Sequence, residues 1–182
     1  MDQSDEDLSR EAATGDLQAA SELLDRHYQK IFSYFRRLSG NDSDASDLSQ
    51  KTFCKVWSGI GGYGGRSRFS TWVHSIAHHV YVDWRRVHNR LDGQTDEWWL
   101  ACPGEGPSPF DSAADKDLAG HLYGLIEQLE EEARETVHLH YYQGLSLQET
   151  ADALGIASST VKYRLRNALD VLRNRLPEEK RS

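Results

Sequence analysis

Residues 145–176 read LSLQETADALGIASSTVKYRLRNALDVLRNRL, and this stretch decides the fold. Ser146 and Glu149 have the spacing of a capping box, in which each side chain bonds to the backbone N–H of the other residue at the start of a helix. Gly155 ends that helix, because glycine adopts a positive φ at little cost. A second helix begins only a few residues later. The stretch therefore predicts a helix-turn-helix.

The second helix of this pair is basic on the face that its apolar residues leave open. Ser158 or Ser159 can cap it, and its buried face is formed at helical spacing by Val161, Leu165, Ala168, Leu169, Leu172 and Leu176. Residues 157–175 contain five basic side chains against one acid, Asp170, so their net charge is +4. Such a helix fits the major groove of DNA with its first residues at the base edges. Groups suited to these contacts are offered by Ser159, Thr160, Lys162, Tyr163 and Arg164. The alternative is a solvated charged helix packed on a helical bundle.

The chain has 182 residues and a formal net charge of −8, which argues against a protein that coats nucleic acid. The charge is unevenly distributed, since residues 26–65 carry +3 and residues 66–91 carry +4. The acidic parts are residues 1–25, with −7, and residues 92–115, with −6. Two basic patches in an acidic chain indicate specific contacts with nucleic acid and suppression of non-specific ones.

Cysteines and apolar runs exclude several other classes of protein. Cys54 and Cys102 lie far apart with no paired spacing, so neither a disulfide framework nor a zinc knuckle is expected. The first residues are acidic and polar, unlike those of a signal peptide. No apolar run approaches the roughly 18 residues that a membrane span needs. We therefore expect a cytoplasmic protein that is not inserted in a membrane and has no cofactor.

Two helices are predicted in the first third of the chain. The first covers residues 16–38 and follows an acidic lead-in, residues 2–7, that we expect to be frayed. The second covers about residues 45–60 and can be capped by Ser43 or Asp44. Its buried side is predicted to contain Leu48, Phe53, Val56, Trp57 and Ile60.

A glycine-rich segment, residues 59–65, leads into a third helix at about residues 69–90. The segment lacks the Gly-Lys-Ser/Thr ending of a phosphate-binding P-loop, so we interpret it as a mobile loop that lets the backbone approach a ligand closely. The helix interleaves aromatic residues with arginines. This composition suits single-stranded nucleic acid, because rings stack on bases while cations follow phosphates. The alternative is that most of these rings belong to the core.

Two histidines of the third helix raise the possibility of a metal-dependent hydrolase. His74 and His78 are four residues apart and share a helix face, so they could hold a metal. A zincin would need glutamate directly after the first histidine, where this chain has Ser75, and Asp83 is the one carboxylate nearby. We therefore expect neither a metal site nor an enzymatic activity.

Residues 91–115 are predicted to be an acidic flexible linker, because they are rich in proline and glycine and poor in helix signals. Their apolar patch Trp98-Trp99-Leu100 is predicted to be a docking contact. Two further helices, ending at about Tyr142, precede the helix-turn-helix. The expected fold class is all-α, with two small helical domains joined by the linker. The domains span residues 10–90 and 116–177.

Six segments resemble the extracytoplasmic-function (ECF, group IV) family of RNA polymerase sigma factors. In the N-terminal half they are DLSQKTFCKVW at residues 47–57, FSTWVHSIA at residues 69–77 and DWRR at residues 83–86. In the C-terminal half they are GLSLQETA at residues 144–151, LGI at residues 154–156 and STVK at residues 159–162. The resemblance spans roughly residues 10–177, in the order of the family.

The resemblance implies a transcription initiation factor that directs core RNA polymerase to particular promoters. The N-terminal domain would bind the β′ clamp helices of the polymerase through Asp47, Gln50 and Lys51. It would also capture the melted −10 element with Tyr63, Arg66, Arg68, His78, His79, Asp83, Arg85 and Arg86. The C-terminal domain would read the −35 element as duplex with Ser158, Ser159, Thr160, Lys162, Tyr163, Arg164 and Arg166. The implied partners are core RNA polymerase, through its β′ clamp helices and β flap, promoter DNA and an anti-sigma factor.

The chain departs from the family pattern at His78-His79, where Arg-Asn is usual, and at Thr150, where isoleucine is usual. The histidine pair raises the hypothesis that −10 binding depends on pH, and a flat promoter affinity between about pH 6 and 8 would overturn it. The alternative function is a helix-turn-helix regulator that binds duplex DNA without joining polymerase. That alternative leaves the glycine-rich loop and the aromatic-basic helix unexplained.

Overall fold

The computed structural model describes residues 3–88 and 116–175, and the predicted linker with its Trp98-Trp99-Leu100 patch lies outside them. Two compact units make up the chain, Met1–Leu100 with Asp152–Gly155 and Ala101–Ala151 with Ile156–Ser182. No strand occurs in the described part, so the all-α prediction is confirmed. The exact domain boundaries stay a prediction, because they fall at or beyond the edges of the described ranges.

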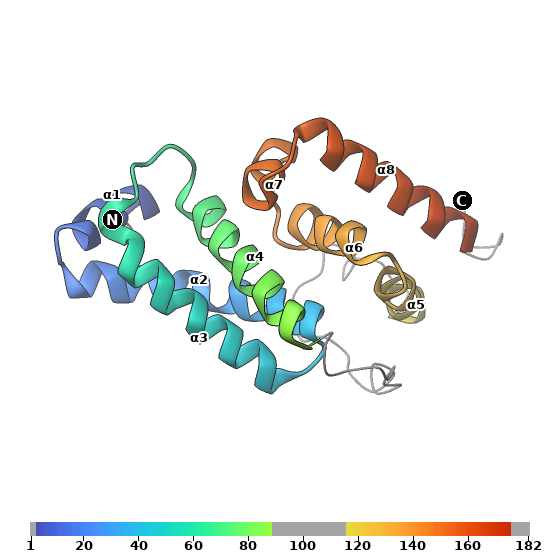
Figure 1. Ribbon diagram of the computed structural model, residues 1–182, viewed down its shortest axis with the longest axis horizontal. Helices are drawn as coiled ribbons and strands as arrows, with labels where there is room; N and C mark the ends of the chain where they lie inside the picture. Colours follow the sequence, from blue (N-terminus) through green and yellow to red (C-terminus); the bar gives the residue numbers. More distant parts are fainter. Residues whose placement is uncertain (1–2, 89–115, 176–182) are drawn as a thin grey trace. The chain divides into compact units, whose positions relative to one another are not determined.

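The helices before the linker form the N-terminal unit (Figure 1). They are α1 (Asp5–Ala13), α2 (Leu17–Ser39), α3 (Asp42–Gly59), the short 3-10 helix η1 (Ile60–Gly62) and α4 (Phe69–His88). Helix α3 packs against both α2 and α4, and α1 packs against α2. The largest buried side chains of this unit include Leu23, Ile31, Tyr34, Phe35, Leu48, Phe69 and Tyr81.

The helix starts of this unit were only partly predicted. Asp16 begins α2 as expected, and its carboxylate accepts hydrogen bonds from two backbone N–H groups. The predicted cap of α3 at Ser43 or Asp44 is wrong. Asn41 holds that position, because its side-chain oxygen accepts the N–H of Asp44 at 2.8 Å.

Two predictions about burial and order in this unit are wrong. Of the predicted frayed lead-in, the described residues 3–7 are ordered instead, since Ser4 caps α1 and the helix buries Leu8 against its neighbours. Trp57 is 44% exposed, because the buried stripe of α3 runs through Val56 and leaves Trp57 beyond its edge. Both errors concern residues whose surroundings are set by a partner helix.

The helices after the linker, apart from the end of α7 from Asp152 onward, form the C-terminal unit (Figure 1). They are α5 (Lys116–Glu127), α6 (Glu131–Val137), the π-helical turn η3 (His138–Tyr142), α7 (Leu147–Leu154) and α8 (Ser158–Arg175). The core of this unit is formed by Leu125, Ile126, Leu129, Val137, Ala151, Val161, Leu165, Ala168 and Leu172. Most of the residues that the sequence placed on the buried face of the second helix therefore do lie in the core.

The helix-turn-helix forms as its capping pattern predicts. Ser146 Oγ accepts the N–H of Glu149 at 3.2 Å, and the Glu149 carboxylate accepts the N–H of Ser146 at 2.9 Å. Gly155 has a φ of +65°, which an L side chain rarely adopts. The turn between α7 and α8 is therefore held by both features that the sequence indicated.

Two details of α8 differ from expectation. The helix begins at Ser158, and the carbonyl of Ala157 accepts the N–H of Val161. Ala157 therefore holds the cap position that was predicted for Ser158 or Ser159. Leu169 is 48% exposed rather than buried, since the core stripe of α8 passes through its neighbour Ala168.

Candidate functional site

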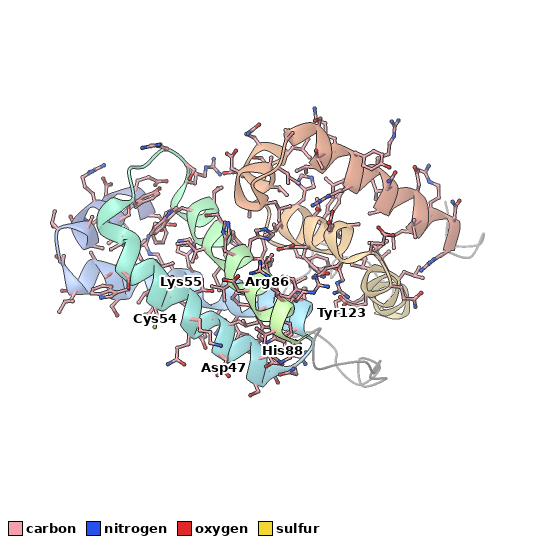
Figure 2. All side chains as sticks on the ribbon, viewed as in Figure 1. Asp47, Cys54, Lys55, Arg86, His88 and Tyr123 are labelled. Atoms are coloured by element: carbon pink, nitrogen blue, oxygen red, sulfur yellow. The ribbon has the colours of Figure 1, made fainter. Side chains whose placement is uncertain are left out.

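A groove between α3 and the C-terminal half of α4 contains the three residues that the resemblance assigns to polymerase binding. Asp47, Gln50 and Lys51 are exposed on α3 and line the groove together with Cys54 and Lys55. Its volume is about 690 Å³. Figure 2 shows Asp47, Cys54 and Lys55 on α3, with Arg86 and His88 on α4. Asp47, Gln50 and Lys51 lie three or four positions apart or side by side in the sequence, and the turn of α3 brings all three to the same groove.

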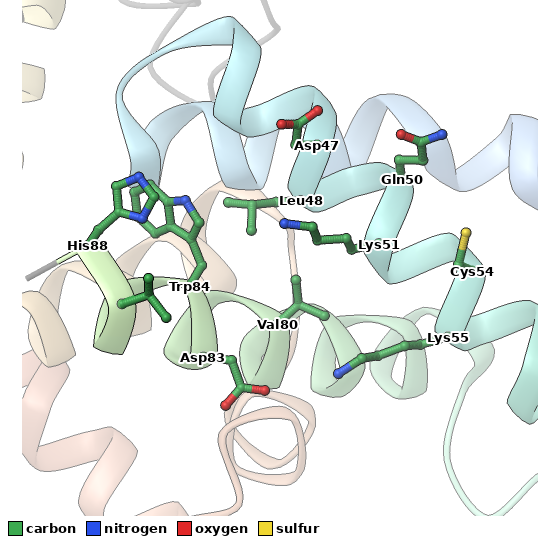
Figure 3. A pocket seen from close by; sticks show the side chains of 11 residues that line it. Asp47, Leu48, Gln50, Lys51, Cys54, Lys55, Val80, Asp83, Trp84 and His88 are labelled. Atoms are coloured by element: carbon green, nitrogen blue, oxygen red, sulfur yellow. The ribbon is translucent and has the colours of Figure 1, made fainter.

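The groove has an apolar floor and a charged rim. Its apolar lining comes from Leu48, Val80, Trp84 and Val87, and the Trp84 ring stacks on His88 with 4.2 Å between ring centroids. Figure 3 shows Lys51 and Lys55 reaching from α3 toward α4. An apolar centre with a polar rim is the usual anatomy of a protein-binding surface. Reasoning from the sequence missed this floor, because it forms only where α3 and α4 pack together.

Asp83 lines the same groove, although the resemblance assigns it to the −10 element. Its carboxylate is 3.7 Å from the guanidinium of Arg86, one turn along α4. Both side chains are largely exposed, so this ion pair is weak. Asp83 is therefore available to a partner that binds in the groove.

The glycine-rich loop is closed by an aromatic cluster, which we define as Tyr63, Phe69 and Trp72. The Tyr63 ring lies 4.9 Å from the Trp72 ring and 5.6 Å from the Phe69 ring. Tyr63 Oη donates a hydrogen bond to the carbonyl of Ser67 at 2.6 Å. Burial, followed by the charges of Glu6 and Asp5, raises the pKa of Tyr63 above its ordinary value, so the phenol stays a donor. The cluster leaves the neighbouring arginines of the loop exposed.

The predicted −10 residues fall into two groups rather than one pocket. Arg66 and Arg68 are exposed on the loop, before α4. His79, Asp83 and Arg86 are exposed one turn apart along α4 and share a face. Helical rise separates Arg68 from Asp83 by about 20 Å. The two groups therefore form a strip long enough for several nucleotides.

The remaining −10 candidates are less accessible. His78 is half-buried, with 5.5 Å between its ring centroid and that of His79. The guanidinium of Arg85 lies over the Tyr81 ring, 6.0 Å from its centroid. These residues are better placed to orient the strip than to form its outer surface.

His74 is a core residue of the N-terminal unit. It is 1% exposed, its Nδ1 is 2.8 Å from the carbonyl of Ser70, and its ring meets Tyr34 edge-on. Within residues 3–88 and 116–175 no group of three or more potential metal ligands comes together. The geometry gives the hydrolase alternative no support. None of the helices in the described ranges combines the length and the apolarity of a transmembrane segment.

The predicted −35 residues divide between two faces of α8. Ser159, Lys162, Tyr163 and Arg166 are exposed at spacings of three and four residues and form one face. Arg164 points elsewhere, because its guanidinium pairs with Glu132 at the start of α6. The other two candidates, Ser158 and Thr160, are half-buried in the first turn.

The exposed face of α8 continues toward its C-terminus. Lys162, Arg166 and Arg173 line a shallow groove of about 330 Å³, which also contains Asp170 and Leu169. Arg173 was not among the predicted −35 residues, although its spacing of seven from Arg166 places it on the same face. The face carries three cations against one acid and matches a DNA backbone in charge.

Comparison with known proteins decides the family. Residues 23–91 match Sigma-70 region 2, and residues 121–172 match Sigma-70, region 4. ECF RNA polymerase sigma factor SigL of Mycobacterium tuberculosis is 30% identical over 92% of this chain and 94% of its own length. This chain belongs to the ECF RNA polymerase sigma factors. As a sigma factor, it is a transcription initiation factor that directs RNA polymerase to promoters.

Further relatives agree with this assignment. ECF RNA polymerase sigma factor SigE of Mycolicibacterium smegmatis is 32% identical over 90% of this sigma factor, which spans 65% of that relative's length. A solved structure of the sigma factor RpoE of Bartonella quintana, in complex with the anti-sigma factor NepR, has a TM-score of 0.68 at 22% identity. It covers 85% of this chain and 94% of the RpoE chain, and shows that the fold is shared. None of these relatives indicates an enzymatic activity.

Proposed function

We propose that the groove between α3 and α4 docks the β′ clamp helices of core RNA polymerase. Asp47, Gln50 and Lys51 would pair with polar groups at its rim, while Trp84 and Val87 bury apolar side chains of the clamp at its floor. Fully desolvated apolar anchors carry most of the affinity of such interfaces, and rim charges mainly set orientation and association rate. The groove is therefore proposed to determine both the affinity of the complex and the orientation in which the two proteins bind.

The glycine-rich loop and the exposed strip of α4 are proposed to capture the melted −10 element. Arg66, Arg68 and Arg86 would follow its phosphates, and a base extruded from the stack would lie against the loop. Extrusion costs a few kcal/mol, which stacking and phosphate contacts must offset. The exposure of the loop arginines beside a ring cluster supports this assignment.

The exposed face of α8 is proposed to read the −35 element in the major groove. Lys162 and Arg166 have the reach and charge for phosphates and guanine edges, and Ser159 and Tyr163 add hydrogen-bonding groups near the helix start. Arg164 is proposed to hold α8 on α6 instead of contacting DNA. The −35 contacts would thus come from one side of a single helix.

The proposal includes an anti-sigma factor and excludes catalysis by this chain alone. The relative RpoE has been solved with the anti-sigma factor NepR, and we propose a comparable partner that covers the α3–α4 groove. Competition for one surface would keep the sigma factor from polymerase. Both partners are expected in the cytoplasm, and no cofactor is needed for any of these steps.

One observation carries the proposal: the residues assigned to polymerase line one groove, and most of those assigned to duplex DNA share one exposed helix face. The test is transcription in vitro with purified core RNA polymerase on genomic promoter fragments, with and without the protein. We expect new, defined start sites that disappear with Asp47→Ala plus Gln50→Ala. A matched control is Asp25→Ala plus Gln29→Ala, which removes the same residue types from an exposed part of α2.

The outcomes separate the two functions considered for this chain. Loss with the α3 pair and retention with the α2 pair supports docking in the groove. Duplex binding without any polymerase-dependent transcript would contradict the proposal and favour a regulator that acts without joining polymerase.

A further inference from the structure

Helix α1 is tied to the rest of the N-terminal unit by a partly buried network of hydrogen bonds and an ion pair. The carboxylate of Asp5 accepts hydrogen bonds from His27 Nε2 at 2.8 Å and from the Arg26 guanidinium at 3.1 Å. The same guanidinium donates to the carbonyl of Gln3 at 2.7 Å. Burial alone would raise the pKa of Asp5, but the hydrogen bond from His27 and the hydrogen bond and charge of Arg26 outweigh it and keep that pKa below its ordinary value. The start of α1 is therefore fixed to α2 by charged hydrogen bonds.

His27 connects this network to the aromatic cluster of the loop. It is 3% exposed, and its ring meets the Phe69 ring edge-on at 5.2 Å. Burial lowers the pKa of His27 below its ordinary value, although Asp5 opposes that shift. The neutral imidazole must then donate from Nε2 to the carboxylate of Asp5, which fixes the ring plane. The orientation of the ring that supports Phe69 thus depends on Asp5.

Phe69 in turn supports the loop. Its ring lies 5.6 Å from the Tyr63 ring and 5.7 Å from the Trp72 ring, and Phe69 itself is 1% exposed. Tyr63 closes the loop through its hydrogen bond to the Ser67 carbonyl. Helix α1 also packs directly on η1, which begins the loop. A continuous set of contacts therefore runs from Asp5 to Ser67, which lies between the two loop arginines.

We propose that α1 positions the −10 loop, with Asp5 and His27 as positioning residues that act through Phe69 and Tyr63. This inference rests on the proposed capture of the −10 element by the loop. Neither residue touches DNA in this account. Their role is to hold the rings in one arrangement before the strand arrives, so that less ordering remains when it binds. Helix α1 would thus affect promoter opening without affecting polymerase docking, because neither Asp5 nor His27 lines the α3–α4 groove.

The test compares three full-length variants in complex with core polymerase. Asp5→Ala removes the acceptor of His27, and Asp5→Asn keeps an oxygen acceptor at the same place. Asp7→Ala is the matched control, because Asp7 lies on the same helix but bonds only to its exposed neighbours Ser4 and Arg10 in the described contacts. The probe is a single-stranded oligonucleotide that carries the −10 region of a start site mapped by transcription. Core affinity is measured in parallel.

We expect Asp5→Ala to weaken oligonucleotide binding about fivefold to tenfold, which is the size of the effect of losing one ordinary hydrogen bond. With Asp5→Asn the loss of oligonucleotide affinity, on a logarithmic scale, should be at most half as large. With Asp7→Ala the oligonucleotide affinity should stay within about twofold of that of the unaltered protein. Core affinity should change by less than about twofold in all three. A general weakening of the unit would instead lower core binding as well, because α3 lies in the same unit.

Three results would overturn the inference in distinguishable ways. If Arg66→Ala plus Arg68→Ala abolishes oligonucleotide binding but Asp5→Ala binds like the unaltered protein, α1 does not position the loop. If the Arg66→Ala plus Arg68→Ala variant also binds normally, the loop does not capture the −10 element, and the proposed function fails together with the inference. An equal loss of core and oligonucleotide binding with Asp5→Ala would assign Asp5 a structural role only.

Discussion

The two proposed DNA-binding surfaces of this sigma factor are built in opposite ways. The −35 surface is one side of α8, whose exposed residues Lys162, Tyr163 and Arg166 are set by the helical repeat alone. The shape of the −10 loop depends on Tyr63 and Phe69, whose rings pack against each other, and on the contact of Phe69 with His27 of α2. A duplex presents a regular groove that a preformed helix fits, whereas an extruded base needs a pocket assembled from several segments. Substitutions on the exposed face of α8 should therefore change DNA binding without changing stability. Substitutions among the rings of the loop should change both.

The largest expected effect is on folding, at the aromatic cluster. Phe69→Ala should lower the free energy of unfolding by about 3–5 kcal/mol, because it removes a buried ring and leaves a cavity beside His27, Tyr63 and Trp72. Tyr163→Ala is the matched aromatic control on α8, where the side chain is 65% exposed, and should change stability by less than about 0.5 kcal/mol. Denaturant unfolding measures both. Equal losses for the two variants would contradict the contrast between the surfaces.

The next effect is on DNA affinity, at α8. Arg166→Ala should weaken binding of a −35 duplex by about 1–3 kcal/mol, or roughly tenfold to a hundredfold, because it removes an exposed guanidinium from the proposed contact face. Arg164→Ala is the matched control, since that guanidinium pairs with Glu132. We expect it to change duplex affinity by less than about threefold. Titration at one fixed salt concentration decides between them, and a larger loss with Arg164→Ala would reverse the assignment of the two faces.

A smaller effect concerns the helix-turn-helix core. Thr150 is fully buried, and its hydroxyl has no hydrogen-bond partner in the described part of the chain. Thr150→Val should stabilise the protein by about 1 kcal/mol, since it removes an unsatisfied polar group at constant shape. Thr136 is equally buried, but its hydroxyl donates to the carbonyl of Glu132 at 2.6 Å. Thr136→Val should therefore destabilise the protein by about 1 kcal/mol. Thermal unfolding of both variants tests the prediction, which is wrong if Thr150→Val destabilises the protein or Thr136→Val stabilises it.

The smallest effect is a pH dependence of folding that belongs to the loop side of the comparison. Burial holds the pKa of His27 below its unfolded value, so the unfolded chain takes up a proton first as the pH falls. The contribution of His27 to stability is thus complete above about pH 6.5 and declines below it. His27→Gln, which keeps a donor at the position of Nε2, should flatten the decline between pH 7 and pH 5 in denaturant unfolding. An unchanged slope would mean that His27 is not the responsible group.

The contrast between the surfaces also explains what the sequence could predict. The helix-turn-helix depends on local signals, namely the Ser146–Glu149 box, Gly155 and the apolar repeat of α8, and all three appear in the structure. The exposure of Lys162 and Arg166 followed from the same repeat. The pairing of Arg164 with Glu132 did not, because it depends on how α6 packs against α8.

Features that join distant segments were not predicted. His27 and Phe69 are 42 positions apart in the sequence, and no local pattern places an imidazole against that ring. The acidic start of the chain was misread for the same reason, since Asp5 is stabilised by a partner on α2. The groove floor at Trp84 and Val87 likewise becomes visible only when α3 and α4 are side by side. Family resemblance identified the rim of that groove and left its floor unassigned.

The most direct test of the account is a crossed binding experiment on the reconstituted complex with core polymerase. Two probes, a −35 duplex and a −10 single strand from one mapped promoter, are titrated against Arg166→Ala and against Arg66→Ala plus Arg68→Ala. We predict that the α8 variant loses affinity for the duplex alone and that the loop variant loses affinity for the single strand alone. Equal losses on both probes for both variants would contradict the assignment of −35 and −10 recognition to separate surfaces.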